Sequence, residues 1–313
     1  MIQSNVELNR YNTYKVGGEA EYFTKVNSVA DLLKAKAWAI ENNKRVNVIG
    51  KGSNLLIASG LIEGLTIVNN LKGYSIDEEG ILTVYSGENI SCLATKLSKE
   101  GWCGLEWAVG IPGSVGGAIT MNAGAHKECV ADKLIDITAL SRKNNLVEFS
   151  NEELDFAYRH TNIQDSNYFV VEGRFQLTQE KSRGEAWAKA QEYISYRHTT
   201  QPYNLPSCGS VFRNPLNKQA GKLIEDSYLK GFSFLGAEVS KKHANFIINN
   251  GDATAESIFT LMNFVERIIK DKYDINLIRE VKTLGSLREI SLFGVDPDEL
   301  NEIVKQGMKT NAK

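Results

Sequence analysis

The stretch PSCGSVFRNP, Pro206 to Pro215, places two candidate nucleophiles, Cys208 and Ser210, on one short segment with the cation Arg213. Proline fixes φ and lacks an amide hydrogen, so this segment cannot form a regular helix or a central strand. Loops held in unusual conformations often carry function. Ser210 is not part of G-x-S-x-G and no histidine base lies close in sequence, so an acyl-transfer role is disfavoured. Cys208 has no evident partner and is expected to pack beside the loop.

Two glycine-rich stretches have the composition of phosphate-binding loops. GKGSN, Gly50 to Asn54, is a weak signal alone, because a tight turn explains it equally well. GIPGSVGGAITMNAGA, Gly110 to Ala125, is far more unusual, since repeated glycines leave bare backbone that can approach an anion closely. Neither stretch fits G-x-G-x-x-G or the P-loop. The pair favours one long ligand, such as a dinucleotide.

Composition limits the function classes. The chain has 313 residues, 42% of them hydrophobic and 24% charged, which is typical of a soluble globular protein of two or three domains. The net charge of -2 gives no global attraction for nucleic acid or an anionic membrane. The four cysteines and four histidines are dispersed, so we expect reduced thiols in a cytoplasmic protein and no metal site. No signal peptide is visible.

The uncharged run from Trp107 to Ala125 resembles a membrane span in length. It contains five glycines and a proline, which a lipid-exposed helix would tolerate poorly. We therefore expect a buried loop system.

Alternating strand and helix signals must position these loops. Strands are predicted at 20–26 and 45–50, with a helix capped by Ser28 between them and an apolar run at 55–58 after them. Further strands are predicted at 81–87, 134–142, 146–150 and 168–177, with a helix at 91–100. RKNN, 142–145, indicates a hairpin turn.

The C-terminal part has a different character. A charged helix is predicted within 180–199, a second near 221–227, and a strongly periodic one around 258–269 with Thr254 as N-cap. Strands are expected at 244–250 and 275–281, and the residues from 286 on are typical of an appended amphipathic helix.

Seven motifs together resemble one family. NTYKVGGEAEYF, GKGSNLLI, GIPGSVGGAITMNAGA, YRHT, GSVFRNP, HANFIIN and LIREVKTLG occur in the order found in UDP-N-acetylenolpyruvoylglucosamine reductase (UDP-N-acetylmuramate dehydrogenase), over about Asn5 to Gly285. The long glycine motif and the GSVFRNP loop are the specific ones. The short region between Phe175 and Cys208 is similar to the shorter, type II form, which lacks the inserted tyrosine segment.

The resemblance implies an α+β fold: a two-lobed FAD-binding module of the vanillyl-alcohol-oxidase type followed by a C-terminal α/β substrate-binding domain. We place the two lobes at 1–70 and 71–178, the substrate domain at 179–285 and an extension at 286–313. The implied cofactor is non-covalent FAD, with NADPH as co-substrate. Its binding residues would be Gly50, Lys51, Gly52, Ser53, Asn54, Leu55, Gly110, Ile111, Pro112, Gly113, Ser114, Gly116, Gly117, Ala118, Asn122, Gly124 and Ala125.

The implied reaction is reduction of UDP-N-acetylglucosamine enolpyruvate to UDP-N-acetylmuramate, in peptidoglycan precursor synthesis. Hydride passes from reduced flavin N5 to the enolpyruvyl methylene carbon. By similarity, Ser210 protonates the neighbouring carbon, while Arg159 and Glu280 stabilise the intermediate. Desolvation could raise the pKa of Glu280 enough to keep it protonated. The implied partners are small molecules, in a cytoplasmic monomer.

Substrate contacts are assigned less directly. Two residues resemble groups that meet the UDP-sugar, and five more are further contacts that ordinary surface roles explain equally well: Arg213 and Asn214, then Arg197, Gln201, Lys242, His243 and Asn245. The chain departs from the commonest pattern where Arg213 replaces lysine and Thr161 replaces serine.

Two other functions stay open at the level of the sequence. One is a different FAD-dependent oxidoreductase that oxidises an alcohol or a lactone, with His126 as a candidate for covalent flavin attachment. The other is a non-catalytic protein that binds a dinucleotide or a UDP-sugar. The motifs of the C-terminal domain argue against the first, and the presence of Arg159, Ser210 and Glu280 argues against the second.

Overall fold

The computed structural model describes residues 1–164, 166 and 168–290. The chain folds as two compact units, each assembled from segments distant in the sequence. Unit 1 comprises Met1–Val6, Ala20–Gly52 and Glu63–Thr199, and unit 2 comprises Glu7–Glu19, Ser53–Ile62 and Thr200–Lys313. The division 1–70, 71–178 and 179–285 stays a prediction, and most of the predicted extension at 286–313 lies outside the described residues.

Unit 1 contains a four-stranded sheet with one helix against it. The strand order is β1-β2-β5-β3, and β3 and β5 run parallel. The helix α1 starts where the Ser28 side chain accepts a hydrogen bond from the Asp31 amide at 3.1 Å, as the sequence predicts. Leu32 on α1 packs against Leu65 and Ile67 of β5. The bounds are β1 Gln3–Glu7, β2 Glu19–Val26, α1 Val29–Glu41, β3 Val46–Ile49 and β5 Ile62–Asn69.

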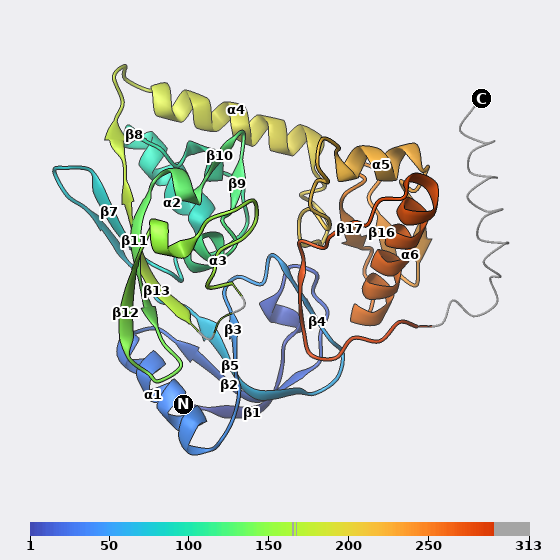
Figure 1. The fold of residues 1–313 in the computed structure, drawn as a ribbon, viewed down its shortest axis with the longest axis horizontal. Coiled ribbons are helices and arrows are strands. Elements are labelled where there is room, and N and C mark those ends of the chain that lie inside the picture. Colours follow the sequence, from blue (N-terminus) through green and yellow to red (C-terminus); the bar gives the residue numbers. More distant parts are fainter. Residues whose placement is uncertain (165, 167, 291–313) are drawn as a thin grey trace. The chain divides into compact units, whose positions relative to one another are not determined.

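A second, five-stranded antiparallel sheet forms the rest of the unit 1 framework (Figure 1). Its order is β12-β11-β13-β7-β6, and the hairpin between β11 and β12 turns at Asn144, whose φ is +65°. The helices α2 and α3 and the buried Trp107 share the core of this sheet. The bounds are β6 Tyr74–Ile76, β7 Ile81–Tyr85, α2 Ile90–Lys99, α3 Val115–Thr120, β11 Leu134–Leu140, β12 Leu146–Ser150 and β13 Phe169–Gln176.

Short elements connect this framework. Strand β8 (Trp102–Cys103) pairs with β14 (Thr178–Gln179), and β9 (Gly124–Ala125) pairs with β10 (Glu128–Cys129). The helix predicted within 180–199 is α4, Glu185–Thr200, which starts just after Gly184. Three short 3-10 helices complete the unit: Glu106–Ala108, Val130–Asp132 and Glu152–Leu154.

Unit 2 is built around one long helix, α6 (Ala255–Tyr273), as its periodicity predicts. Thr254 and Ser257 form a capping box at its start, with the Ser257 amide donating to Thr254 Oγ1 at 3.1 Å. The face of α6 carrying Leu261 and Val265 packs into a core that also takes Tyr14 and Leu56. The other elements are a 3-10 helix Asn9–Tyr11, β4 Leu55–Ile57, α5 Ala220–Asp226, β15 Ser233–Phe234, β16 Ala237–Val239, β17 Ile247–Asn249 and β18 Lys282–Leu284.

Two expectations are corrected. The residues 275–281 do not form a strand, because their backbone pairs with the loop around Val211 and Arg213 through isolated hydrogen bonds. The strand β18 begins at Lys282 and pairs in parallel with β4. The stretch 110–125 is not loop throughout. Ser114 caps the six-residue helix α3 by accepting from the Gly117 amide at 3.3 Å, so two of the motif glycines lie within a helix.

Candidate active site

The loop Pro206–Pro215 is fixed to unit 2 by the backbone and side chain of Asn245. The Val211 amide donates to Asn245 O at 2.8 Å. The Asn245 side chain then accepts from the Phe212 amide at 3.0 Å and donates to Phe212 O at 2.8 Å. Gly209 has φ +75°, a conformation that favours glycine. The loop therefore turns sharply just before the half-buried Ser210 and is rigid just after it.

Glu280 lies across from Val211, the residue that follows Ser210 in unit 2. The Glu280 amide donates to Val211 O at 2.7 Å, and the Arg213 amide donates to Ile278 O at 2.8 Å. The side chain of Asn54 donates a hydrogen bond to Glu280 O at 2.9 Å. These bonds hold side by side the backbone segments that carry Ser210 and Glu280, together with one residue of the GKGSN stretch.

Cys208 faces away from this chemistry. Its thiol donates to Leu55 O at 3.3 Å and lies 3.4 Å from Thr13 Oγ1, and the residue is 3% exposed. Burial raises the pKa of the Cys208 thiol to about 12. A thiol that does not ionise is a poor nucleophile, so Cys208 packs the base of the loop.

The other predicted substrate contacts of unit 2 lie around the same loop. Asn214 Oδ1 accepts from the Ala220 amide at 3.0 Å and so helps start α5. His243 Nδ1 accepts from the Asn245 amide at 3.2 Å, while burial and the nearby Lys230 lower the pKa of His243. Gln201 and Lys242 also belong to unit 2. For Asn214, Asn245 and His243, the structure thus gives each side chain a role in holding the loop, and their contact with substrate stays a prediction.

Arg213 is half-buried and its Nε has no hydrogen-bond partner within the described part of the chain. A buried guanidinium nitrogen without an acceptor is unfavourable. An anionic group of a ligand would supply one. The neighbouring Arg279 is used differently, because it pairs with Glu266 at 2.6 Å and lies over the Phe259 ring.

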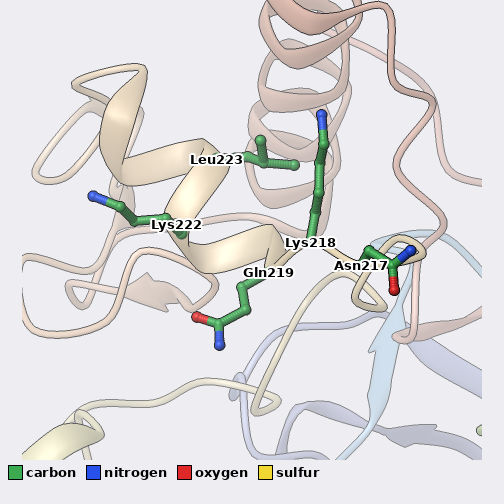
Figure 2. Close-up of a pocket in the computed structure, with 5 residues that line it drawn as sticks. All are labelled: Asn217, Lys218, Gln219, Lys222 and Leu223. Carbon is green, nitrogen blue, oxygen red and sulfur yellow. The ribbon is translucent and has the colours of Figure 1, made fainter.

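A cavity of about 540 Å³ lies just beyond this loop, at the start of α5. Its lining residues are Asn217, Lys218, Gln219, Lys222 and Leu223. Figure 2 shows the ammonium ends of Lys218 and Lys222 directed away from each other, and Lys222 is paired with Asp226 at 2.7 Å. The cations therefore do not converge on a single anion.

Arg159 belongs to unit 1, on the two-residue turn of the YRHT motif. Its guanidinium donates to Gly124 O at 2.9 Å and to Asn122 O at 3.5 Å. Arg197, the other predicted arginine of unit 1, is buried near the end of α4. Arg159 is thus oriented by the last residues of the long glycine motif.

The two glycine-rich stretches of the FAD prediction meet in unit 1. A β-carbon on Gly50 would come within 2.4 Å of Ser114 Oγ, so the stretches touch where a side chain would not fit. The Gly110 amide donates to Ser91 Oγ at 2.6 Å. The remaining predicted FAD residues are Lys51, Gly52, Ile111, Pro112, Gly113, Gly116, Gly117, Ala118, Asn122, Gly124 and Ala125 in unit 1, and Ser53, Asn54 and Leu55 in unit 2.

Packing explains part of the glycine content. A β-carbon on Gly116 would lie 2.7 Å from Ser86 Cβ, and one on Gly124 would lie 2.5 Å from Glu128 O. A β-carbon on Gly117 would meet only Ser114 Oγ, at 3.4 Å. Gly116 and Gly124 therefore allow close approach of protein to protein, whereas Gly117 faces space that a cofactor could occupy.

The surroundings of Lys51 also fit an anionic cofactor. Partial desolvation and the ammonium groups of Lys72 and Lys25 lower the pKa of Lys51. Glu88 pairs with Lys72 at 3.2 Å and only partly offsets this positive charge. A pyrophosphate would relieve the repulsion among the three cations, so the residues present fit FAD.

Several contributors were not predicted from the sequence. Ser86 and Ser91 touch the glycine motif, Lys25 and Lys72 set the charge around Lys51, and Gln164 contacts the Arg159 backbone at 3.2 Å. They lie in separate segments with ordinary composition, so no local pattern could have marked them.

Among residues 1–164, 166 and 168–290, no helix is long and apolar enough to cross a membrane. Within the same ranges, no group of three or more histidine, cysteine, aspartate or glutamate side chains is arranged to hold a metal ion.

The fold and these sites define a class of protein. Residues 20–150 match the FAD-binding domain family, so the chain is a flavin-binding α+β protein with a separate C-terminal domain. Residues 201–284 match the C-terminal domain of UDP-N-acetylenolpyruvoylglucosamine reductase. The chain belongs to the UDP-N-acetylenolpyruvoylglucosamine reductase family.

Curated relatives and a solved structure agree with this assignment. The reductase of Acaryochloris marina is 44% identical over 292 residues, covering 93% of this chain and 95% of its own. The reductase of Synechocystis is 41% identical over 289 residues, covering 91% of each chain. The crystal structure of the enzyme from Thermus caldophilus is 28% identical with a TM-score of 0.78, and covers 91% of this chain and 100% of its own.

Proposed function

We propose that this protein is the FAD-containing, NADPH-dependent reductase of UDP-N-acetylglucosamine enolpyruvate, forming UDP-N-acetylmuramate for peptidoglycan synthesis. The match to curated reductases over nine-tenths of both chains carries this conclusion. It also confirms the α+β fold, the flavoenzyme class and the cofactor expected from the sequence. An alcohol- or lactone-oxidising flavoenzyme and a non-catalytic binder are disfavoured, because the match extends through the C-terminal domain at 201–284.

The chain's own residues have distinct roles in this reaction. FAD, when bound, transfers the two electrons of NADPH as a hydride to the methylene carbon of the enolpyruvyl group. The Ser210 hydroxyl then gives its proton to the neighbouring carbon and regains one from solvent, so each turnover consumes one NADPH and one proton. The rigid loop that holds Ser210 beside the Glu280 backbone supports this role.

Negative charge develops towards the substrate carboxylate when the hydride is added, and two groups are proposed to stabilise it. Arg159 offers a planar fork of donors that suits a carboxylate. Glu280 donates a hydrogen bond in its protonated form. On the substrate side, Arg213 has an Nε without an acceptor among the described residues, which supports a contact with an anionic group of the UDP-sugar.

The finer assignments complete the proposal. The seventeen FAD contacts and the contacts of Arg197, Gln201, Asn214, Lys242, His243 and Asn245 with substrate remain proposals. A monomeric, cytoplasmic enzyme without a nucleic-acid or membrane partner fits a near-neutral chain with a net charge of -2 and nucleotide-linked small-molecule substrates.

The test separates the two half-reactions. Under anaerobic conditions, NADPH should bleach the flavin, and addition of UDP-N-acetylglucosamine enolpyruvate alone should restore its colour. In Ser210→Ala the first step should proceed normally, while the second should slow by about 10²- to 10⁴-fold, the usual contribution of a general acid. Ser207→Ala on the same loop is the matched control and should behave as wild type. Failure of the wild-type flavin to reoxidise would refute the proposed function, and normal reoxidation in Ser210→Ala would remove Ser210 from its role.

A further inference from the structure

Arg159 has a backbone conformation that needs external support. Its φ is +57°, in the left-handed region that residues with a β-carbon rarely adopt. It lies in a tight turn closed by two hydrogen bonds of 3.1 Å between Ala157 and His160. Strain of this kind persists only where the surroundings over-determine it, and it concentrates at functional sites.

The end of the glycine motif supplies the first support. Asn122, which is 6% exposed, donates through Nδ2 to Ala157 O at 2.9 Å, and its Oδ1 accepts from the Ala131 amide at 3.2 Å. Thr161 Oγ1 donates to Thr120 O at 2.8 Å. The turn that carries Arg159 is therefore tied on one side to Asn122, just after α3, and on the other to Thr120, the last residue of α3.

Gln164 supplies the second support. Its Nε2 donates to Arg159 O at 3.2 Å and contacts Met121 Sδ at 3.0 Å. It thus joins the strained residue itself to the same segment whose carbonyl groups, Asn122 O and Gly124 O, orient the guanidinium. The backbone and the side chain of Arg159 are fixed by one short stretch of chain.

We propose that Gln164 and Asn122 are positioning residues for Arg159: they hold its left-handed turn so that the guanidinium meets the substrate carboxylate. The inference rests on the proposed function, because it requires that Arg159 acts in substrate reduction. Loss of the Gln164 side chain should therefore affect the second half-reaction and spare the first.

The test uses the holoenzyme and anaerobic stopped-flow spectroscopy. Gln164→Met keeps the length of the side chain but loses the donor to Arg159 O. Reoxidation by saturating UDP-N-acetylglucosamine enolpyruvate should slow roughly tenfold, as for loss of one partly buried hydrogen bond, while reduction by NADPH stays within about twofold of wild type. Asn122→Asp keeps the acceptor and tolerates positive φ, but loses the donor to Ala157 O, and should also slow reoxidation. Because Asn122 is itself a proposed FAD contact, the comparison of the two half-reactions is made on Gln164→Met. Ser166→Ala removes a neighbouring bond to Ile163 O and should change neither step.

A double variant tests whether the effect passes through Arg159. In an Arg159→Ala background, Gln164→Met should slow reoxidation no further, since the residue it positions is gone. Equal slowing of both half-reactions, an additive effect in the double variant, or loss of flavin from both Gln164→Met and Asn122→Asp would overturn the inference. Failure of the wild-type protein to reoxidise would instead refute the proposed function, so the two failures are distinct.

Discussion

Replacement of Asn245 by alanine should destabilise unit 2 and disable the loop that carries Ser210. The side chain is 5% exposed and satisfies both the amide and the carbonyl of Phe212, at 3.0 and 2.8 Å. Alanine would leave two buried backbone groups unpaired, each at a cost of about 1–3 kcal/mol. The two unpaired groups can move partly into contact with water, which lowers their combined cost, so we expect the free energy of unfolding to fall by about 2–4 kcal/mol.

Urea unfolding followed by circular dichroism, at a fixed FAD concentration, measures this loss. Asn250→Ala is the matched control, because Asn250 is exposed and, among the described residues, its side chain donates to Glu238 Oε2 at 2.8 Å. Its cost should stay below about 0.5 kcal/mol. Reoxidation of the Asn245→Ala flavin by substrate should slow, since the loop holding Ser210 loses its anchor. A difference between the two variants of less than about 0.5 kcal/mol would show that the Phe212 backbone does not depend on Asn245.

Three further outcomes test the packing of the glycine motif, the reactivity of the thiols and the titration of the half-buried His243. Gly116→Ala should lower the free energy of unfolding by about 1–3 kcal/mol, because a β-carbon there would lie 2.7 Å from the Ser86 side chain. Gly117→Ala should keep the wild-type melting temperature and lose FAD affinity, and equal melting temperatures for the two variants would contradict this. Cys208, with a pKa of about 12, should resist a thiol reagent at pH 8 until the protein unfolds, while the exposed Cys92 reacts at once; rapid labelling of Cys208 in the native protein would contradict its burial. Burial, together with Lys230, lowers the pKa of His243 from 6.5 in the folded protein, so on acidification the unfolded chain takes up the proton before the folded one does, and the free energy of unfolding should fall as the pH drops below about 6.5. His243→Asn should make the melting temperature less dependent on pH in this range. An unchanged pH dependence would show that His243 is not responsible for the loss of stability.

The elements that the sequence predicts well are those with local signals. The N-caps Ser28 and Thr254 mark the starts of α1 and α6, and the run at 146–150 forms β12 over the same residues. The prediction of a strand at 275–281 is wrong, because alternating apolar residues indicate an extended chain but do not show whether a partner strand lies beside it.

The candidate site was predictable only in part, for a similar reason. Motif resemblance marked Ser210 and Glu280, but their proximity depends on hydrogen bonds between segments distant in the chain. Gly116 lies in a stretch with the composition of a phosphate-binding loop, yet the structure shows that the absence of a side chain there makes room for Ser86. Gln164 lies in an ordinary polar stretch, and its contact with Arg159 arises only from the tertiary fold.

The parallel pairing of β4 with β18 has a consequence for synthesis of the chain. Strand β4 (Leu55–Ile57) leaves the ribosome early, but Lys282–Leu284, which completes its backbone pairing, is among the last of the described residues to appear. Tyr14 and Leu56 must likewise wait for α6 to bury them. Unit 2 can therefore close only after translation is nearly finished, and a fragment beginning at Thr200 would lack part of its own core. We expect that the C-terminal region cannot be obtained as a stable domain by a single cut in the chain.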